Sequence, residues 1–236
     1  MADGCQHVYI DLGSNVGVQV RKLFEPHLYV PSKSIPIFDR FFGVSEVRRE
    51  STCAFGFEMN WVHTEKLRRI ERAYNRVGWR TRFFAETGVG TDFAVVKNDY
   101  KPSHPTEDFA VGASIPFPTN STEPRDGGSS DVAHSVRIVD IGAFINDVAA
   151  RRTEPDGGRI VMKMDIEGWE FPVLPHLLYT KNLCKVDFIY IEMHAIVPTF
   201  LPHVRSALAR AKCPTELFEL DDEYLGESNF PLPNLL

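Results

Sequence analysis

The sequence predicts an α/β fold in which a doubly wound, mostly parallel sheet carries helices on both faces. Short runs rich in β-branched and aromatic residues alternate with segments of helical periodicity. Several of these runs are apolar at nearly every position, as expected for parallel strands that are buried on both faces. The 236 residues suffice for one domain with a sizeable core. We therefore expect a single domain, 1–236, with insertions at about 26–49 and 98–135.

The first predicted strand begins at Val8 and leads into a glycine turn. Gly13 and Gly17 allow the chain to turn sharply, and residues 16–24 continue at helical spacing. In an open α/β sheet this turn lies at the carboxyl end of a strand, where a ligand meets backbone N–H groups. The turn lacks the third glycine of the dinucleotide fingerprint, and the preceding Asp11 suits a sulfonium group better than a pyrophosphate. The favoured cofactor is therefore S-adenosylmethionine rather than NAD.

The remaining elements follow in an alternating order. The segment 26–49 contains a predicted short helix, 35–42, which either covers the cofactor or adds packing. The segment 98–135 is rich in proline and glycine and is predicted to be a lid or a substrate-binding loop. Further strands are predicted at 53–57, 80–84, 93–96, 136–139, 187–191 and 217–220 and in a run that begins at 159; helices are predicted at 64–77, 141–151 and 200–211, and a turn at 88–91.

Acidic residues follow several of the predicted strands. Glu58 ends the second strand, a position from which a carboxylate accepts hydrogen bonds from both ribose hydroxyls of a nucleotide-type cofactor. Glu86 follows the third strand, where its side chain can reach an adenine ring. A solvent-facing carboxylate without a ligand is the alternative for Glu58.

A second charged motif lies in an otherwise buried run. Lys163, Asp165 and Glu167 alternate along it, so the first two share one face and Glu167 lies at or just past its end. Buried charges are costly unless they are paired, so the three residues form either an ion-pair network or a site. His194 follows the next strand, two residues after Glu192.

The composition excludes some classes of partner. The net charge is -6, so no nucleic-acid binding is expected, and the arginines of 68–82 are predicted to form a solvated helix face. No apolar run is long enough to cross a membrane. The four cysteines form no Cys-x-x-Cys pair, which favours free thiols in a reducing compartment. A cytoplasmic protein is the expectation; a secretory-pathway catalytic domain without its anchor is the alternative.

Four segments together resemble the FkbM-type methyltransferase family. They are residues 9–17, the pair Phe57-Glu58, residues 163–170 and residues 190–194. The resemblance implies a Rossmann-like, class I methyltransferase fold, S-adenosylmethionine as cofactor, and O-methylation of a hydroxyl on a sugar or small natural product. The acceptor would then be a small molecule or a glycan.

The resemblance also implies roles for individual residues. It implies that the turn holds the methionine part of the cofactor, that Glu58 holds the ribose and that Glu86 meets the adenine edge. The residues predicted to bind the cofactor are Asp11, Gly13, Ser14, Asn15, Gly17, Glu58, Met59, Glu86 and Asp165. The residues predicted to take part in catalysis are Asp165, His194, Glu167 and Lys163.

Transfer of a methyl group to a hydroxyl needs a general base within hydrogen-bond reach. Asp165 is the first candidate and His194 the second, while Glu167 orients the acceptor or holds the cofactor amino group, and Lys163 is the buried partner of the carboxylates. No metal ligand is predicted. Three alternatives remain: a Mg²⁺-assisted reaction at Asp165, Glu192 and His194, a cofactor-binding module without activity, and, least favoured, an NAD-linked reductase, which would need a Tyr-x-x-x-Lys pair.

Overall fold

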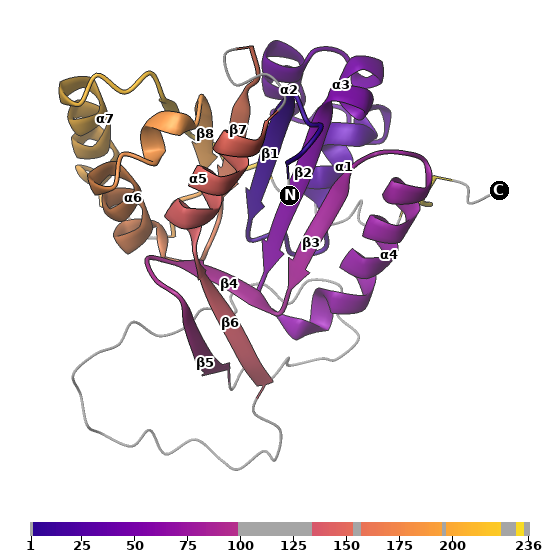
Figure 1. Ribbon diagram of the computed structural model, residues 1–236, viewed down its shortest axis with the longest axis horizontal. Helices are drawn as coiled ribbons and strands as arrows, with labels where there is room; N and C mark the ends of the chain where they lie inside the picture. The colour runs from indigo at the N-terminus through magenta and orange to yellow at the C-terminus, as the bar shows by residue number, and fades with distance from the viewer. Residues whose placement is uncertain (1, 99–133, 153–156, 195–196, 223–229, 234–236) are drawn as a thin grey trace.

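The computed structural model describes residues 2–98, 134–152, 157–194, 197–222 and 230–233. Within them the chain builds one sheet of six strands and one of three (Figure 1). Every neighbouring pair in the larger sheet is parallel. Its strands in spatial order are β3 (Thr81–Ala85), β2 (Thr52–Glu58), β1 (His7–Leu12), β7 (Ile160–Met164), β8 (Phe188–Ile191) and β9 (Glu216–Glu219).

The strand order reverses between β1 and β7. From β1 the chain moves outward to β2 and β3, then returns to lay β7 on the other side of β1 and moves outward again to β8 and β9. In open α/β sheets, ligands bind outside the carboxyl ends of the strands at such a reversal. The topology therefore directs attention to the ends of β1 and β7.

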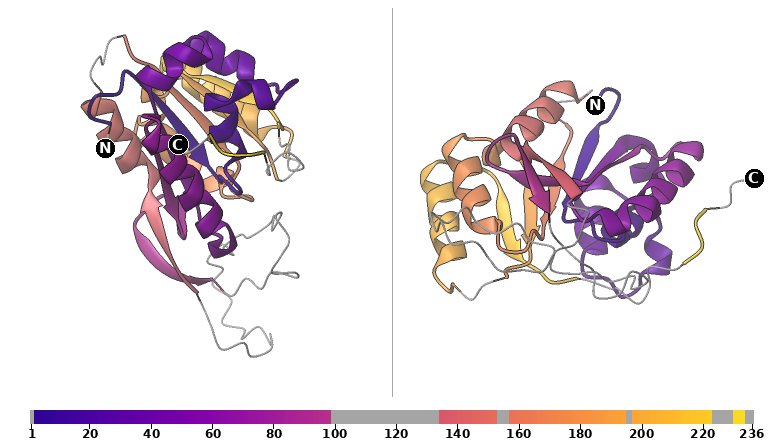
Figure 2. Two further views of the ribbon diagram at one scale, coloured as in Figure 1. Left: turned by 90° about the vertical axis from the view of Figure 1, so that its right-hand side faces the viewer. Right: turned by 90° about the horizontal axis from the view of Figure 1, so that it is seen from below.

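Helices cover both faces of this sheet (Figures 1 and 2). Alternate residues of each central strand face opposite layers, so Tyr9 packs with one cluster and Ile10 with the other. The Tyr9 side contains α1 (Val18–Phe24), α2 (Ile35–Phe42) and α4 (Thr64–Arg76), and the Ile10 side contains α5 (Ile141–Arg151), α6 (Glu170–Tyr179) and α7 (Phe200–Arg210). The remaining helical segments are α3 (Ser45–Ser51), η1 (Pro26–Leu28), η2 (Trp61–His63) and η3 (Leu183–Lys185). The predicted doubly wound fold is confirmed.

The helix predicted at 35–42 packs onto the sheet. The rings of Phe38 and Tyr9 lie 5.0 Å apart in an edge-to-face arrangement, and Phe38 also meets Tyr190 of β8. Phe38 and Phe42 are buried. The prolines and aromatic residues of this segment therefore add a helix to the Tyr9 layer.

The smaller sheet extends beyond the carboxyl ends of β1, β2 and β3 (Figure 1). It consists of β4 (Thr87–Gly90), β6 (His134–Asp140) and β5 (Ala94–Asn98), with β4 and β6 parallel and β5 and β6 antiparallel.

The turn predicted at 88–91 is wrong, because Gly88 and Gly90 are strand residues. A Cβ at either glycine would lie 2.8 Å from the side chain of Ile138, so the glycines let that side chain pack against the strand backbone. The predicted insertion at 98–135 falls almost entirely on residues 99–133, outside the described residues.

The expectation of free thiols is also wrong. All four cysteines are paired, Cys5 with Cys53 and Cys184 with Cys213. The partners are 48 and 29 residues apart in sequence, and strand pairing brings the first two together, since Val8 of β1 is in register with Cys53 of β2. The inference of a reducing compartment thereby loses its support.

Arginine side chains lie on the surface of α4 and around β3. The arginine side chains of α4 and β3 are exposed, as expected for a solvated face: Arg68, Arg69, Arg72, Arg76 and Arg82, together with the neighbouring Arg80. In the part of the chain that is described, no helix combines the length and the apolar character that a membrane crossing requires.

Candidate functional site

The predicted site residues lie along one edge of the larger sheet. Five of them end or follow strands that stand in the order β3, β2, β1, β7 and β8. The corresponding residues at that edge are Glu86, Glu58, Gly13, Asp165 and His194. Because parallel strands end at the same side, the fold brings together residues that are up to 181 positions apart in sequence.

The glycine turn after β1 requires glycine at two positions. Gly13 has φ +79°, and a Cβ on it would lie 1.7 Å from the carbonyl oxygen of Asp165. Gly17 has φ +82°, and a Cβ there would lie 2.8 Å from Ile70 Cδ1. The backbone N–H of Gly13 donates to the carbonyl of Phe57 at 3.0 Å. The turn is therefore held against β2, β7 and α4 by contacts that a larger side chain would break.

Asp11 and Ser14 lie on either side of that turn, and both are buried. Asp11 is in register with Gly56 of β2 and Lys163 of β7, so its side chain lies on the same face of the sheet as that of Lys163. The Ser14 hydroxyl donates to the Asp11 carbonyl at 3.2 Å. It would also lie 2.5 Å from a Cβ on Gly56, which makes glycine necessary there too.

Glu58 is held by backbone groups. Its Oε2 accepts the N–H of Asn15 and its Oε1 accepts the N–H of Asn60, both at 2.7 Å. Asn15 has φ 48°, the left-handed conformation that turns this N–H toward the carboxylate. Burial raises the pKa of Glu58 to about 7, and the two backbone donors oppose that rise. The site thus fixes a carboxylate in one orientation and leaves each oxygen a lone pair for a ligand hydroxyl.

Met59 and Glu86 border the same region. A Cβ on Gly88 of β4 would lie 3.8 Å from Met59 Sδ, so this thioether packs over the small sheet. Glu86 has φ 53°, and its Oε1 accepts a hydrogen bond from Thr64 Oγ1 at 3.2 Å. Both side chains are partly exposed.

Lys163 and Asp165 form a close ion pair beside the turn. Lys163 Nζ donates to Asp165 Oδ2 at 2.6 Å and to the Gly13 carbonyl at 3.0 Å, and the two side chains are only 4% and 12% exposed. Lys163 lies in β7, whereas Asp165 follows the strand and continues its hydrogen bonding to β1 through the Leu12 carbonyl. The lysine therefore fixes Asp165 relative to the glycine turn.

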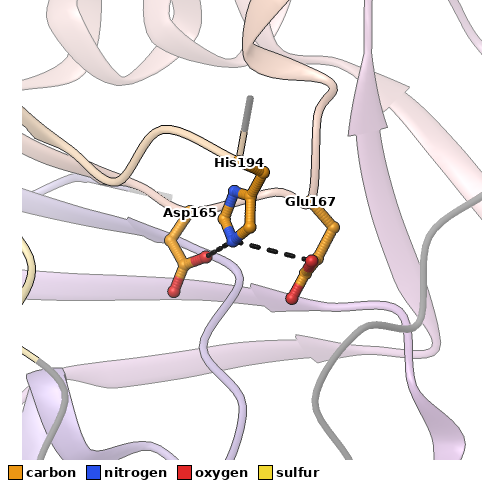
Figure 3. Close-up of side chains that lie close together, drawn as sticks. All are labelled: Asp165, Glu167 and His194. Carbon is orange, nitrogen blue, oxygen red and sulfur yellow. Dashed lines mark ion pairs between the residues drawn. The ribbon is translucent and has the colours of Figure 1, made fainter. Parts of the chain in front are cut away.

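His194 lies among four carboxylates, two of which appear with it in Figure 3. Its Nε2 is 3.4 Å from Asp165 Oδ1, 3.5 Å from Glu167 Oε2 and 3.8 Å from Glu192 Oε1. Its Nδ1 is 3.2 Å from Oε1 of Glu170. The fold thus gathers residues from the segments after β7 and β8, and from the start of α6, into one charged cluster.

This environment affects the imidazole. The hydrogen bond to Glu170 and the charges of Glu167, Glu170 and Asp165 raise the pKa of His194 to about 9, against the opposite effect of partial burial. At neutral pH the imidazole is therefore protonated and balances part of the negative charge around it.

Sequence reasoning assigned no role to Glu170. The residue is fully buried at the start of α6, and its Oε1 accepts the Ile166 N–H at 2.8 Å while facing His194. An acid in the first turn of a helix is a recognisable signal. The helix itself was not predicted, because the motif before it was interpreted as the end of a strand.

A comparison with known protein families gives one match. The family model described as methyltransferase FkbM domain matches residues 40–214. The matched range contains Glu58, Glu86 and the whole His194 cluster, and it begins after the glycine turn. No curated protein and no solved structure matches the chain.

Proposed function

Since the chain belongs to the FkbM methyltransferase family, we propose that it transfers a methyl group from S-adenosylmethionine to a hydroxyl of a small-molecule or glycan acceptor. The main support for this proposal is the position of the His194 cluster. It lies at the reversal of strand order, beside a glycine turn and beside Glu58, which is held by backbone N–H groups. One edge of the larger sheet can thus hold a nucleotide-type cofactor next to a set of proton-accepting groups.

In this proposal the cofactor lies along the edge from β2 to β7. Glu58 accepts hydrogen bonds from the ribose hydroxyls, because both of its oxygens are oriented and retain accepting capacity. Met59 and Glu86 lie near the adenine, on the side of the small sheet. The methionine part lies over the turn and its surroundings, formed by Asp11, Gly13, Ser14, Asn15, Gly17 and Asp165.

The reaction is an in-line displacement. The acceptor oxygen forms a bond to the methyl carbon, the carbon–sulfur bond breaks with its electron pair going to sulfur, and the hydroxyl proton passes to a base. Asp165 is the proposed base, because Lys163 holds its carboxylate at the end of β7, next to the turn. His194 is the second candidate, and Glu167 orients the acceptor from its partly exposed position.

The proposal predicts methyl transfer from labelled S-adenosylmethionine to members of a panel of sugars and polyhydroxylated small molecules. Asp165→Asn should lower kcat by about a hundredfold or more, the usual contribution of a positioned base, and should change the affinity for S-adenosylhomocysteine far less. Glu46→Gln, on the exposed α3, is the matched control. Methyl transfer confined to nitrogen acceptors, or an Asp165→Asn variant with normal kcat, would contradict the proposal.

A further inference from the structure

We propose that Asp165, Glu167 and His194 bind one divalent transition-metal ion, of the Mn²⁺ or Zn²⁺ type, at the carboxyl ends of β7 and β8. No metal ligand was expected from the sequence, and the Mg²⁺ alternative considered there placed Glu192 in the site instead of Glu167. Metal binding as such is independent of the proposed function, whereas the role given to the ion below rests on it.

The geometry of the three donor atoms supports an ion. One ligand atom from each residue lies within 4.8 Å of the others, and His194 Nε2 is 3.4 Å and 3.5 Å from the two carboxylate oxygens (Figure 3). Atoms bound to one ion at about 2.1 Å are about 3.0 to 3.4 Å apart in octahedral or tetrahedral sites. The distances from His194 Nε2 to the two carboxylate oxygens are therefore close to those around a shared ion.

The buried Glu170 provides an independent indication. Metal-bound histidines almost always donate their second ring N–H to a carboxylate, a carbonyl or water, which fixes the tautomer. Glu170 is fully buried and faces Nδ1 of His194 at 3.2 Å, while its Oε2 has no hydrogen-bond partner among the described residues. This contact directs the Nε2 lone pair of a neutral imidazole toward Asp165 and Glu167.

The other ring nitrogen of His194, Nε2, faces more hydrogen-bond acceptors than it can donate to. Nε2 faces Asp165, Glu167 and Glu192, but one N–H can satisfy only one of them well. With Glu170, four carboxylates thus face the two nitrogens of one imidazole. A divalent cation that replaces the Nε2 proton would bind several of these oxygens at once.

The ligand types indicate which ion fits. Imidazole suits zinc and other transition metals, whereas carboxylates suit Mg²⁺, Ca²⁺ and Mn²⁺. A site with one imidazole and two carboxylates lies between these groups, and Mn²⁺ and Zn²⁺ accept both kinds of ligand. Mg²⁺ prefers oxygen ligands in a strict octahedron and should bind more weakly here.

Given the proposed methyl transfer, the ion would act on the acceptor. A bound hydroxyl oxygen loses its proton more readily on a divalent cation. With the ion bound, Asp165 would act as a ligand instead of as the base proposed above, and Glu192, 3.8 Å from His194 Nε2 and 30% exposed, would accept that proton. The resulting alkoxide attacks the methyl carbon, and the carbon–sulfur bond breaks with its electron pair going to sulfur.

The test is a titration of the chelator-treated full chain with MnCl2 alone, followed by the electron paramagnetic resonance signal of free Mn²⁺. We expect one site per chain, displacement of Mn²⁺ by ZnCl2, and little displacement by MgCl2. Glu167→Gln and His194→Gln should weaken binding at least tenfold, and Glu170→Gln about ten- to hundredfold, as lost outer-shell contacts do. Glu46→Gln, on the exposed α3, should bind like the parent.

Circular dichroism and the affinity for S-adenosylhomocysteine, measured without metal, show whether each variant is folded and whether the cofactor site is intact. A folded parent that binds no Mn²⁺, or that binds it equally well in Glu167→Gln and His194→Gln, overturns the metal site. If such a protein still binds S-adenosylhomocysteine, the proposed function stands without the ion. Mn²⁺ binding that depends on these residues in a protein without affinity for S-adenosylhomocysteine supports the metal site and contradicts the proposed function.

Discussion

The two halves of the site edge are built differently. On the β1–β2 side, Glu58 is held by the backbone N–H groups of Asn15 and Asn60, and Gly13 allows direct backbone contact with Asp165. On the β7–β8 side, by contrast, His194 meets carboxylates only through side chains. The first half is defined by backbone geometry and the second by charge.

Because of this difference, the two halves are suited to different kinds of ligand. Backbone donors are fixed by the fold, so the Glu58 site presents an oriented acceptor and suits the neutral hydroxyls of a ribose. Side chains with unbalanced charge respond to protons and cations instead. The β1–β2 half therefore suits a constant cofactor, and the β7–β8 half suits the reacting groups.

The largest expected effect is on the free energy of unfolding, and it follows from removing either of the two disulfides. Cys5–Cys53 joins the β1–β2 half, whereas Cys184–Cys213 joins η3 to the segment before β9. For loops of 48 and 29 residues, removing either bond should lower the free energy of unfolding by about 4 kcal/mol in the chain-entropy estimate. Urea unfolding of Cys5→Ser and Cys184→Ser measures both changes.

The longer loop predicts a slightly larger loss for Cys5→Ser. Thiol titration of the denatured, unreduced protein provides the control and should detect no free cysteine. Four reactive thiols in that experiment would show that neither half is cross-linked.

A smaller effect concerns pH and the β1–β2 half alone. Burial raises the pKa of Glu58 to about 7, so its carboxylate is mostly ionised above this pH and mostly protonated below it. Because the ionised form is the better hydrogen-bond acceptor, affinity for S-adenosylhomocysteine should fall about fivefold between pH 8 and pH 6 if the protonated form binds about tenfold more weakly. Calorimetry at both pH values measures the change. In Glu58→Gln, which does not titrate, the affinity should be weaker at both pH values and nearly constant; an equal pH dependence there would assign the titration to another group.

Local patterns predicted much of this structure, and long-range packing determined the rest. The helices predicted at 35–42 and 141–151 have the bounds of α2 and α5, because apolar periodicity and flanking residues are local signals. Acids predicted to follow strands meet at one edge, since parallel strands end on the same side.

The wrong predictions concern features that depend on long-range packing and not on local patterns. Cys5 and Cys53 pair because β1 and β2 are neighbours, which no cysteine spacing reveals. Gly88 is typical of a turn, yet it belongs to a strand because Ile138 packs over it. The contact of Glu170 with His194 depends on where α6 begins relative to β8.

Calorimetric titration with S-adenosylhomocysteine shows whether the β1–β2 half binds the proposed cofactor. We predict micromolar binding by the parent protein, weakened about tenfold, or 1.4 kcal/mol, in Glu58→Gln and changed far less in Glu167→Gln. A folded parent protein that binds no S-adenosylhomocysteine, or a Glu58→Gln variant that binds it as tightly as the parent, would contradict the account.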